Sequence, residues 1–261
     1  MEEYKTKYPI VLVHGMVLKD FKIYRAFRKI RDILKQNNIS VYVTTHDGIG
    51  TIENNALQIK KEILDILDKE KVDKVNIIAH SKGGLDSRYM ISKLDMDEHV
   101  ASLTTLSTPH HGSKLSTKLL SMPNWCAKFL AFWINLFYKI HKDEKPDILT
   151  LGHQLKDSTM VEFNKDVLNS NKVYYQSYSS DLNNQKSFVM LIPHLITKKL
   201  EQVGTDGIVS TESSIWGEYQ GNMKNNFDHG EMVGAYGTKK RLNEVSKFYL
   251  EIIKDLKQKG F

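Results

Sequence analysis

The sequence predicts an α/β protein with a mostly parallel central sheet and helices on both faces. Short apolar runs alternate along the chain with longer segments whose apolar residues recur at helical spacing. The runs are nearly continuous in apolar residues, which is typical of parallel strands buried on both faces. No repeat, low-complexity tract or linker marks a boundary, so we expect one domain over residues 1–261.

The first half of the chain supplies strands and helices in alternation. The expected strands are short and mostly β-branched: Tyr8–Val13, Ile39–Val43, Val75–Ala79 and Val100–Leu106. The expected helices carry an apolar stripe: Lys22–Gln36, Glu53–Glu70 and Leu85–Leu94. In such sheets, sites form beyond the carboxyl ends of the strands, so the segments that follow these strands should gather on one edge, which we call the rim.

The second half is less regular. Lys172–Tyr178 is expected to be a strand, and Ile208-Val209 the end of another. Lys239–Lys257 has the apolar spacing of a closing helix.

The segment around Ser81 carries the most specific functional pattern. Ala79-His80-Ser81-Lys82-Gly83 joins an apolar strand to a helical pattern and matches G-x-S-x-G, with Ala79 in place of the first glycine. Small residues two positions either side of the serine permit a tight turn. The turn would raise the Ser81 hydroxyl above the sheet at a helix N-terminus, which favours developing negative charge. We therefore expect Ser81 to be a nucleophile.

A serine hydroxyl needs an adjacent base to react. His229 is the best candidate because it lies in a loop-like stretch before the last helix, after Ser81 in the chain. His110 and His111 also follow a strand, and we expect them to line the rim or to have structural roles.

The base needs a carboxylate that holds its tautomer and stabilises the imidazolium. Asp206 is favoured, because Gly204 and Gly207 permit a sharp turn around it. Asp181 and Asp228 remain alternatives.

Two backbone N–H groups should form an oxyanion hole. One is expected from Lys82, which follows the nucleophile, and the other from Met16 in the His14-Gly15-Met16 loop after the first strand. Their side chains are incidental to that donation.

A long segment, 113–156, interrupts the alternation between two expected sheet strands. Phe129 to Tyr138 contains no charged residue and has aromatic residues in nearly every direction. One interpretation is an additional core helix. We favour a lid or cap over Ser81 with an acyl-binding surface, because the insertion falls on the rim, and residues 125–138 also suit transient contact with a lipid surface.

Composition excludes several classes of function. The formal net charge is +6, but basic residues are scattered, so nucleic-acid binding is not expected. No apolar stretch reaches the length of about 20 residues that a membrane span needs.

The N-terminus lacks an apolar signal region, so localisation stays open between an intracellular protein and a mature form whose leader was removed. The one cysteine, Cys126, is expected to be a packed thiol.

These motifs resemble bacterial triacylglycerol lipases and esterases of the α/β-hydrolase superfamily. The matching segments span nearly the whole chain in the family's order: Tyr8–Gly15, Val75–Gly84, Ser107–Ser113, Thr205–Val209 and Asp228-His229. The resemblance implies a triad of Ser81, Asp206 and His229, with Met16 and Lys82 as oxyanion donors. The Ala79-His80-Ser81 sequence at the turn resembles that of the Bacillus lipases.

Two departures concern metals. Pseudomonas-type lipases hold calcium with an aspartate two residues after the catalytic histidine and a second one well before the catalytic acid. Here Glu231 stands at the first position, and no clear aspartate stands at the second. The zinc-bearing insertion of thermoalkalophilic Bacillus-type lipases has no counterpart, and no Cys/His spacing resembles a metal site. The sequence thus argues against structural calcium and predicts no required cofactor.

The sequence predicts a serine hydrolase of apolar acyl esters. An acyltransferase or thioesterase with the same fold is the alternative. A binding module that has the fold but no catalytic activity is a third hypothesis. True lipases and esterases of soluble substrates share these motifs, so both remain open.

Overall fold

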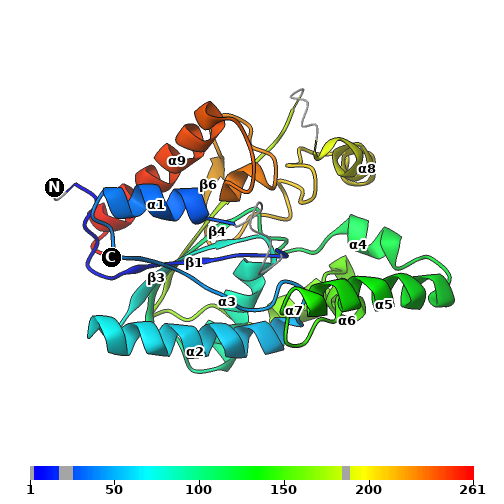
Figure 1. The fold of residues 1–261 in the computed structure, drawn as a ribbon, viewed down its shortest axis with the longest axis horizontal. Helices are drawn as coiled ribbons and strands as arrows, with labels where there is room; N and C mark the ends of the chain where they lie inside the picture. The colour runs from blue at the N-terminus through cyan, green and yellow to red at the C-terminus, as the bar shows by residue number, and fades with distance from the viewer. Residues whose placement is uncertain (1–2, 18–25, 184–188) are drawn as a thin grey trace.

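The computed structural model describes residues 3–17, 26–183 and 189–261. Within them, six parallel strands form one sheet in the order β2-β1-β3-β4-β5-β6 (Figure 1). The strands are β1 (Ile10–Val13), β2 (Val41–Val43), β3 (Val75–His80), β4 (Val100–Leu106), β5 (Tyr174–Ser179) and β6 (Glu218–Asn222).

Helices connect these strands and cover both faces of the sheet (Figure 1). They are α1 (Arg28–Gln36), α2 (Ile52–Glu70), α3 (Lys82–Lys93), α4 (Lys114–Leu119), α5 (Asn124–Ile140), α6 (Ile148–Gln154), α7 (Asp157–Asp166), α8 (Leu191–Glu201), the short 3₁₀ helix η1 (Glu231–Val233) and α9 (Lys239–Gln258). No helix in the described ranges combines the length and apolarity that crossing a bilayer requires.

The strand β1 shows how the core is divided. Ile10 and Leu12 pack with α1 and α9 on one face, whereas Val11 and Val13 pack with α2 and α3 on the other. All four side chains are fully buried. Because successive strand residues point to opposite faces, a continuous apolar run is what a sheet covered on both sides requires. The predicted fold class is therefore confirmed.

Helix α1 begins later than the sequence predicted. The expected helix starts at Lys22, but residues 22–25 lie outside the described ranges, and the helix begins at Arg28. Phe27 precedes it with a left-handed backbone (φ 64°), which no α-helix accommodates. The apolar spacing continued past this point because Phe27 packs in the same core as the helix.

Ile208-Val209 is not the end of a strand, so that prediction was wrong. Thr205 and Ser210 form only an isolated antiparallel bridge, which closes a tight loop around Asp206. The sixth strand is instead β6, whose polar, mostly exposed residues lie at the sheet edge. An edge strand exposed to solvent lacks the apolar run that identifies the interior strands.

The 113–156 segment folds into α4, α5 and α6, which lie beyond the end of the sheet (Figure 1). Helix α5 is mostly exposed: Ala127 and Ala131 are its buried residues, while Trp125 is 74% exposed and Phe129 64%. It is therefore not an additional core helix.

Candidate functional site

Ser81 occupies the sharp turn between β3 and α3. Its backbone (φ 57°, ψ −135°) is one that non-glycine residues rarely adopt, and such strain is concentrated at functional sites. The structure around Gly83 explains why the motif requires a small residue at this position. A Cβ at Gly83 would lie 2.4 Å from the carbonyl oxygen of His14, so α3 can start this close to the loop after β1 only without a side chain there.

Ser81, His229 and Asp206 form a continuous hydrogen-bonded chain. The Ser81 Oγ lies 2.9 Å from His229 Nε2, and His229 Nδ1 lies 2.7 Å from Asp206 Oδ2. A carboxylate only accepts, so Nδ1–H donates to Asp206 and Nε2 is left to accept the serine proton. All three residues are buried. The arrangement provides a serine with a base whose tautomer is held in place.

The loop around Asp206 fixes its carboxylate. The backbone N–H groups of Ile208 and Val209 donate to Asp206 Oδ1 over 2.9 and 2.8 Å, which leaves Oδ2 directed at His229. The His229 N–H also donates to the Asp206 carbonyl at 3.0 Å. The two loops are thus joined through both side chain and backbone.

The alternative acids have other partners. Asp181 accepts from the backbone N–H groups of Asn183 and Thr205. Asp228 accepts from the N–H of Gly230 and from the hydroxyl of Tyr236. Both carboxylates therefore hold loops, and Asp206 is the carboxylate that accepts the hydrogen bond from His229.

The alternative histidines lie beyond the triad. His110 is buried between Thr105 and Arg88 and stacks on Trp216, with ring centroids 5.3 Å apart. Burial, followed by the charge of Arg88, holds the pKa of His110 well below its ordinary value. His111 contacts the Ile215 carbonyl. Their place is structural rather than at the serine.

Met16 and Lys82, the predicted oxyanion donors, both lie close to the serine. Both line one cavity with Ser81. The loop after β1 approaches so closely that a Cβ on Gly15 would be 2.7 Å from Ser81 Cβ. Lys82 is the first residue of α3, so its N–H has no partner within the helix and can serve a developing oxyanion.

Beneath this turn lies a buried ion pair that the sequence analysis missed. The Lys82 Nζ donates to both Asp86 oxygens at 2.7 and 2.8 Å, and Asn55 donates to Asp86 at 3.2 Å. Burial raises the pKa of Asp86 to about 6 and lowers the pKa of Lys82. The i,i+4 spacing of the pair was visible in the sequence and was the one available indication.

His80, the last residue of β3, lies against the base. Its ring is buried and its centroid is 4.4 Å from that of His229. Burial, and then the nearby His229, place the pKa of His80 well below its ordinary value. A neutral ring at this position supports His229 by packing without competing for its proton.

An apolar cavity of about 330 Å³ opens from Ser81 beneath the 113–156 segment. The α5 residues that line it recur at helical spacing: Ala127, Leu130, Ala131 and Ile134. Leucine and isoleucine side chains of α6 and Ile208 complete much of the wall. Such a cavity suits an acyl chain attached to a carbonyl at the serine.

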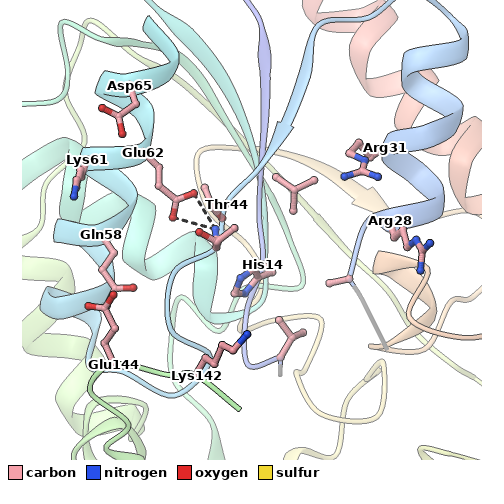
Figure 2. A pocket seen from close by; sticks show the side chains of 14 residues that line it. His14, Arg28, Arg31, Thr44, Gln58, Lys61, Glu62, Asp65, Lys142 and Glu144 are labelled. Carbon is pink, nitrogen blue, oxygen red and sulfur yellow. Dashed lines mark hydrogen bonds between the residues drawn. The ribbon is translucent and has the colours of Figure 1, made fainter. Parts of the chain in front are cut away.

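Figure 2 shows a larger hollow, of about 800 Å³, at the β2 edge. Arg28 and Arg31 of α1 lie on one side of it, and Lys61 and Glu62 of α2 lie on the other, with His14 between them. Its described lining mixes cations and anions and includes no triad residue. Ser81 thus lies at the smaller, apolar cavity and not at this one.

Glu231 does not fit the calcium position implied by the resemblance. Both of its carboxylate oxygens accept from Arg241, at 3.0 and 2.6 Å. Within the described ranges, no three His, Cys, Asp or Glu side chains converge in a way that could hold a metal ion. The Glu231 carboxylate is thus paired with a guanidinium.

Sequence comparisons relate the chain to known proteins. The family model described as palmitoyl protein thioesterase matches residues 9–232, which is more than half of the chain. Triacylglycerol lipase 2 of Saccharomyces cerevisiae is 30% identical over 89% of this chain and 73% of that lipase. The triacylglycerol lipase of Pseudomonas fragi is 26% identical over 98% of both chains.

Solved structures share the fold. A Staphylococcus hyicus lipase superimposes with a TM-score of 0.73 at 16% identity, covering 97% of this chain and 96% of that one. The mature form of a Bacillus licheniformis lipase gives 0.69 at 18% identity, covering 95% and 92%. The chain thus belongs to the palmitoyl protein thioesterase family, among the lipases and esterases of the α/β-hydrolase type, and is a carboxylic ester hydrolase.

Proposed function

We propose that Ser81, His229 and Asp206 hydrolyse apolar acyl esters through an acyl-enzyme. The observation that carries this proposal is the unbroken chain from Ser81 Oγ through His229 to Asp206, with bonds of 2.9 and 2.7 Å. Ser81 attacks the ester carbonyl as its proton passes to His229 Nε2. The imidazolium is stabilised by Asp206, which stays ionised.

The tetrahedral intermediate then collapses. His229 gives the proton to the departing alkoxide, so an alcohol leaves and the acyl group stays on Ser81. Water attacks this ester with His229 again as base, which releases the acid and restores the serine. The N–H groups of Met16 and Lys82 hold the oxyanion in both halves, and each such donor contributes about 2.7–4 kcal/mol to transition-state stabilisation. These groups need no cofactor for either half-reaction.

The cavity favours the acyl group of a lipid as substrate. Its lining is almost entirely apolar, which suits an aliphatic chain better than a charged acid. The relatives named as triacylglycerol lipases support acylglycerols as the substrate class.

Ser81→Ala tests the nucleophile, and Asp206→Asn tests the acid. We expect Ser81→Ala to abolish both p-nitrophenyl ester hydrolysis and labelling by a fluorophosphonate. Asp206→Asn should lower kcat by about 10⁴, because His229 loses the partner that sets its tautomer. Asp181→Asn is the matched control and should retain activity. Full activity in Ser81→Ala would refute the assignment.

Helix α5 supports a second part of the proposal, which is contact of residues 125–138 with a lipid surface. Its outer face exposes Trp125, Phe129 and Phe132, and the last is 61% exposed. The surrounding segment 113–142 contains five lysines and no acidic residue. Apolar residues surrounded by lysines favour an anionic interface, where each lysine contributes about 1 kcal/mol.

Sedimentation with vesicles tests this contact in the Ser81→Ala background, where turnover does not alter the lipid. We expect binding to phosphatidylglycerol vesicles to exceed binding to phosphatidylcholine and to weaken in salt. Trp125→Ser with Phe129→Ser should remove it. Leu57→Ser, which changes a 54% exposed residue of α2, should not. Equal binding by all variants would exclude this face.

Thioester hydrolysis or acyl transfer is the second candidate, favoured by the match to a family described as palmitoyl protein thioesterase. Ser81 would form the same acyl-enzyme and release a thiol instead of an alcohol. Product analysis with matched oxygen and sulfur esters, with alcohol acceptors present, separates these activities. Transfer that exceeds hydrolysis in dilute buffer would overturn the hydrolase assignment.

A rate profile over ester chain length addresses the 113–156 segment, which we propose is a lid. We expect the rate to rise sharply once the ester passes its solubility limit. A smooth profile that favours short chains would mean a fixed cap.

A further inference from the structure

The segment that joins β6 to His229, residues 223–228, contains no helix or strand. The loop leaves β6 through Asn225 and Asn226, whose backbones are left-handed (φ 75° and 47°), and reaches η1 after Gly230. Asparagine adopts this left-handed region more readily than most residues, so the chain can turn here without glycine. With no helix or strand ladder to fix the segment, contacts from neighbouring elements can set the position of His229.

Arg241, in the first turn of α9, supplies such contacts at both ends of the loop. On the β6 side, its Nη1 donates to the Asn225 carbonyl at 2.8 Å and its Nη2 to the Asn226 carbonyl at 3.1 Å. On the η1 side, Nε and Nη2 donate to the two oxygens of Glu231 at 3.0 and 2.6 Å. One planar group thus joins the residues before His229 to those after it.

Two further contacts connect this guanidinium to the base. It lies over the ring of the fully buried Phe227, 4.4 Å from the centroid. Glu231 Oε2 also accepts the N–H of Asp228, the residue directly before His229. The Arg241 and Glu231 side chains are only 20% and 17% exposed. Because water screens this ion pair little, its attraction can hold the loop in place.

The fork of donors explains why arginine is suited to this position. Two parallel bonds to Glu231 and separate bonds to two carbonyls need several N–H groups in one plane. A lysine ammonium in the same place is a point charge that cannot meet all four acceptors at these angles. A divalent cation would have to displace the guanidinium from Glu231.

We infer that Arg241 is a positioning residue for His229, and that its guanidinium serves as the structural cation of this loop in place of a metal ion. The inference rests on the proposed roles of Ser81, His229 and Asp206. Arg241 touches none of the reacting atoms. Its effect on the reaction passes through the loop and fixes the distances from His229 to Ser81 and Asp206.

The test compares Arg241→Met, Arg241→Lys and the control Lys240→Met. Lys240 lies in the same turn, is 86% exposed, and pairs only loosely with Glu244, at 4.0 Å. We expect Arg241→Met to lower kcat by about 10-fold to 100-fold with little change in KM, because a small displacement of the base slows the chemical step. The kcat of Arg241→Lys should lie between those of Arg241→Met and the wild type, and the kcat of Lys240→Met should match that of the wild type.

Two readouts separate positioning from a loss of folded protein. Added methylguanidine should recover part of kcat in Arg241→Met and should leave kcat of Lys240→Met unchanged. The low-field proton resonance of His229 Nδ1–H, measured in the Ser81→Ala background, should broaden or shift in Arg241→Met alone. If Arg241→Met fails to fold, Arg241→Lys with the same two measurements takes its place.

Unchanged kcat and an unchanged Nδ1–H resonance in the folded variants would overturn the inference. So would wild-type activity or thermal stability that falls with EDTA and returns with calcium. The resonance does not depend on turnover. If Ser81→Ala retains full activity, the proposed function fails whether or not the resonance responds to Arg241.

Discussion

At the scale of single residues, Lys82 combines two separable roles. Its backbone N–H, at the first position of α3, is the proposed oxyanion donor, and its side chain forms a buried ion pair with Asp86. Neither charged group is more than 1% exposed. Removing one partner of such a pair is costly because the other charge stays buried without compensation.

Asp86→Asn should lower the free energy of unfolding by about 3–5 kcal/mol, because it leaves the buried Lys82 ammonium without its counter-charge. Asp68→Asn is the control, since Asp68 forms a similar pair with Lys71 but is 84% exposed. The control should cost no more than about 1 kcal/mol. Urea unfolding of both variants measures the difference, and equal effects would contradict this account.

At the scale of secondary-structure elements, α5 is held firmly at its C-terminal end. Asp143 accepts the N–H groups of Gly48 and Ile49, at 2.8 and 3.0 Å. In return, the Asp47 carboxylate accepts the N–H groups of residues 144 and 145, at 2.8 and 2.7 Å. This exchange joins the end of α5 to the loop that precedes α2, so any opening of the segment should pivot here.

Asp143→Ala should release that end of α5 without unfolding the sheet. Hydrogen exchange followed by mass spectrometry should show faster exchange in residues 135–150 and unchanged exchange in β3 and β4. Asp68→Ala, on the exposed surface of α2, is the control. Protection that stays the same in residues 135–150 would mean that apolar packing alone holds the helix.

At the scale of the whole molecule, two buried histidines link stability to pH. The pKa values of His80 and His110 are both held well below the ordinary 6.5, mainly by burial. Both rings are neutral in the folded protein and would take up protons near pH 6.5 in the unfolded chain. The unfolded state then binds more protons, so stability is fully present above pH 6.5 and falls as the pH drops below it.

We expect the free energy of unfolding to decrease from pH 7.5 to pH 6, approaching about 1.4 kcal/mol per pH unit for each histidine below 6.5. The raised pKa of Asp86, about 6, acts in the opposite direction as the pH falls toward 6, because the folded protein then takes up a proton that the unfolded chain does not, and it offsets part of this decrease. Urea unfolding across this range measures the slope, and His110→Asn should reduce it. A free energy of unfolding that stays constant or rises as the pH falls from 7.5 would show that these rings are not neutral in the folded protein.

Much of the fold and the candidate site followed from local patterns. The four early strands, the final helix and the Ser81 turn were predicted because each depends on the spacing of neighbouring residues. Strand β6 and the start of α1 were not. The first lacks an apolar pattern at an exposed edge, and the second depends on the backbone of Phe27.

The sequence by itself determined the α/β class, the serine in its tight turn and the histidine that the structure brings to it, and it favoured Asp206 among three candidate acids. These follow from residue type and order, which set turn geometry and strand burial. Only the tertiary structure decided that Asp206 rather than Asp181 bonds His229, that α5 exposes its aromatic face, and that Arg241 occupies the Glu231 carboxylate. Each of these joins segments far apart in the chain, and their distance depends on how the whole sheet and its helices pack.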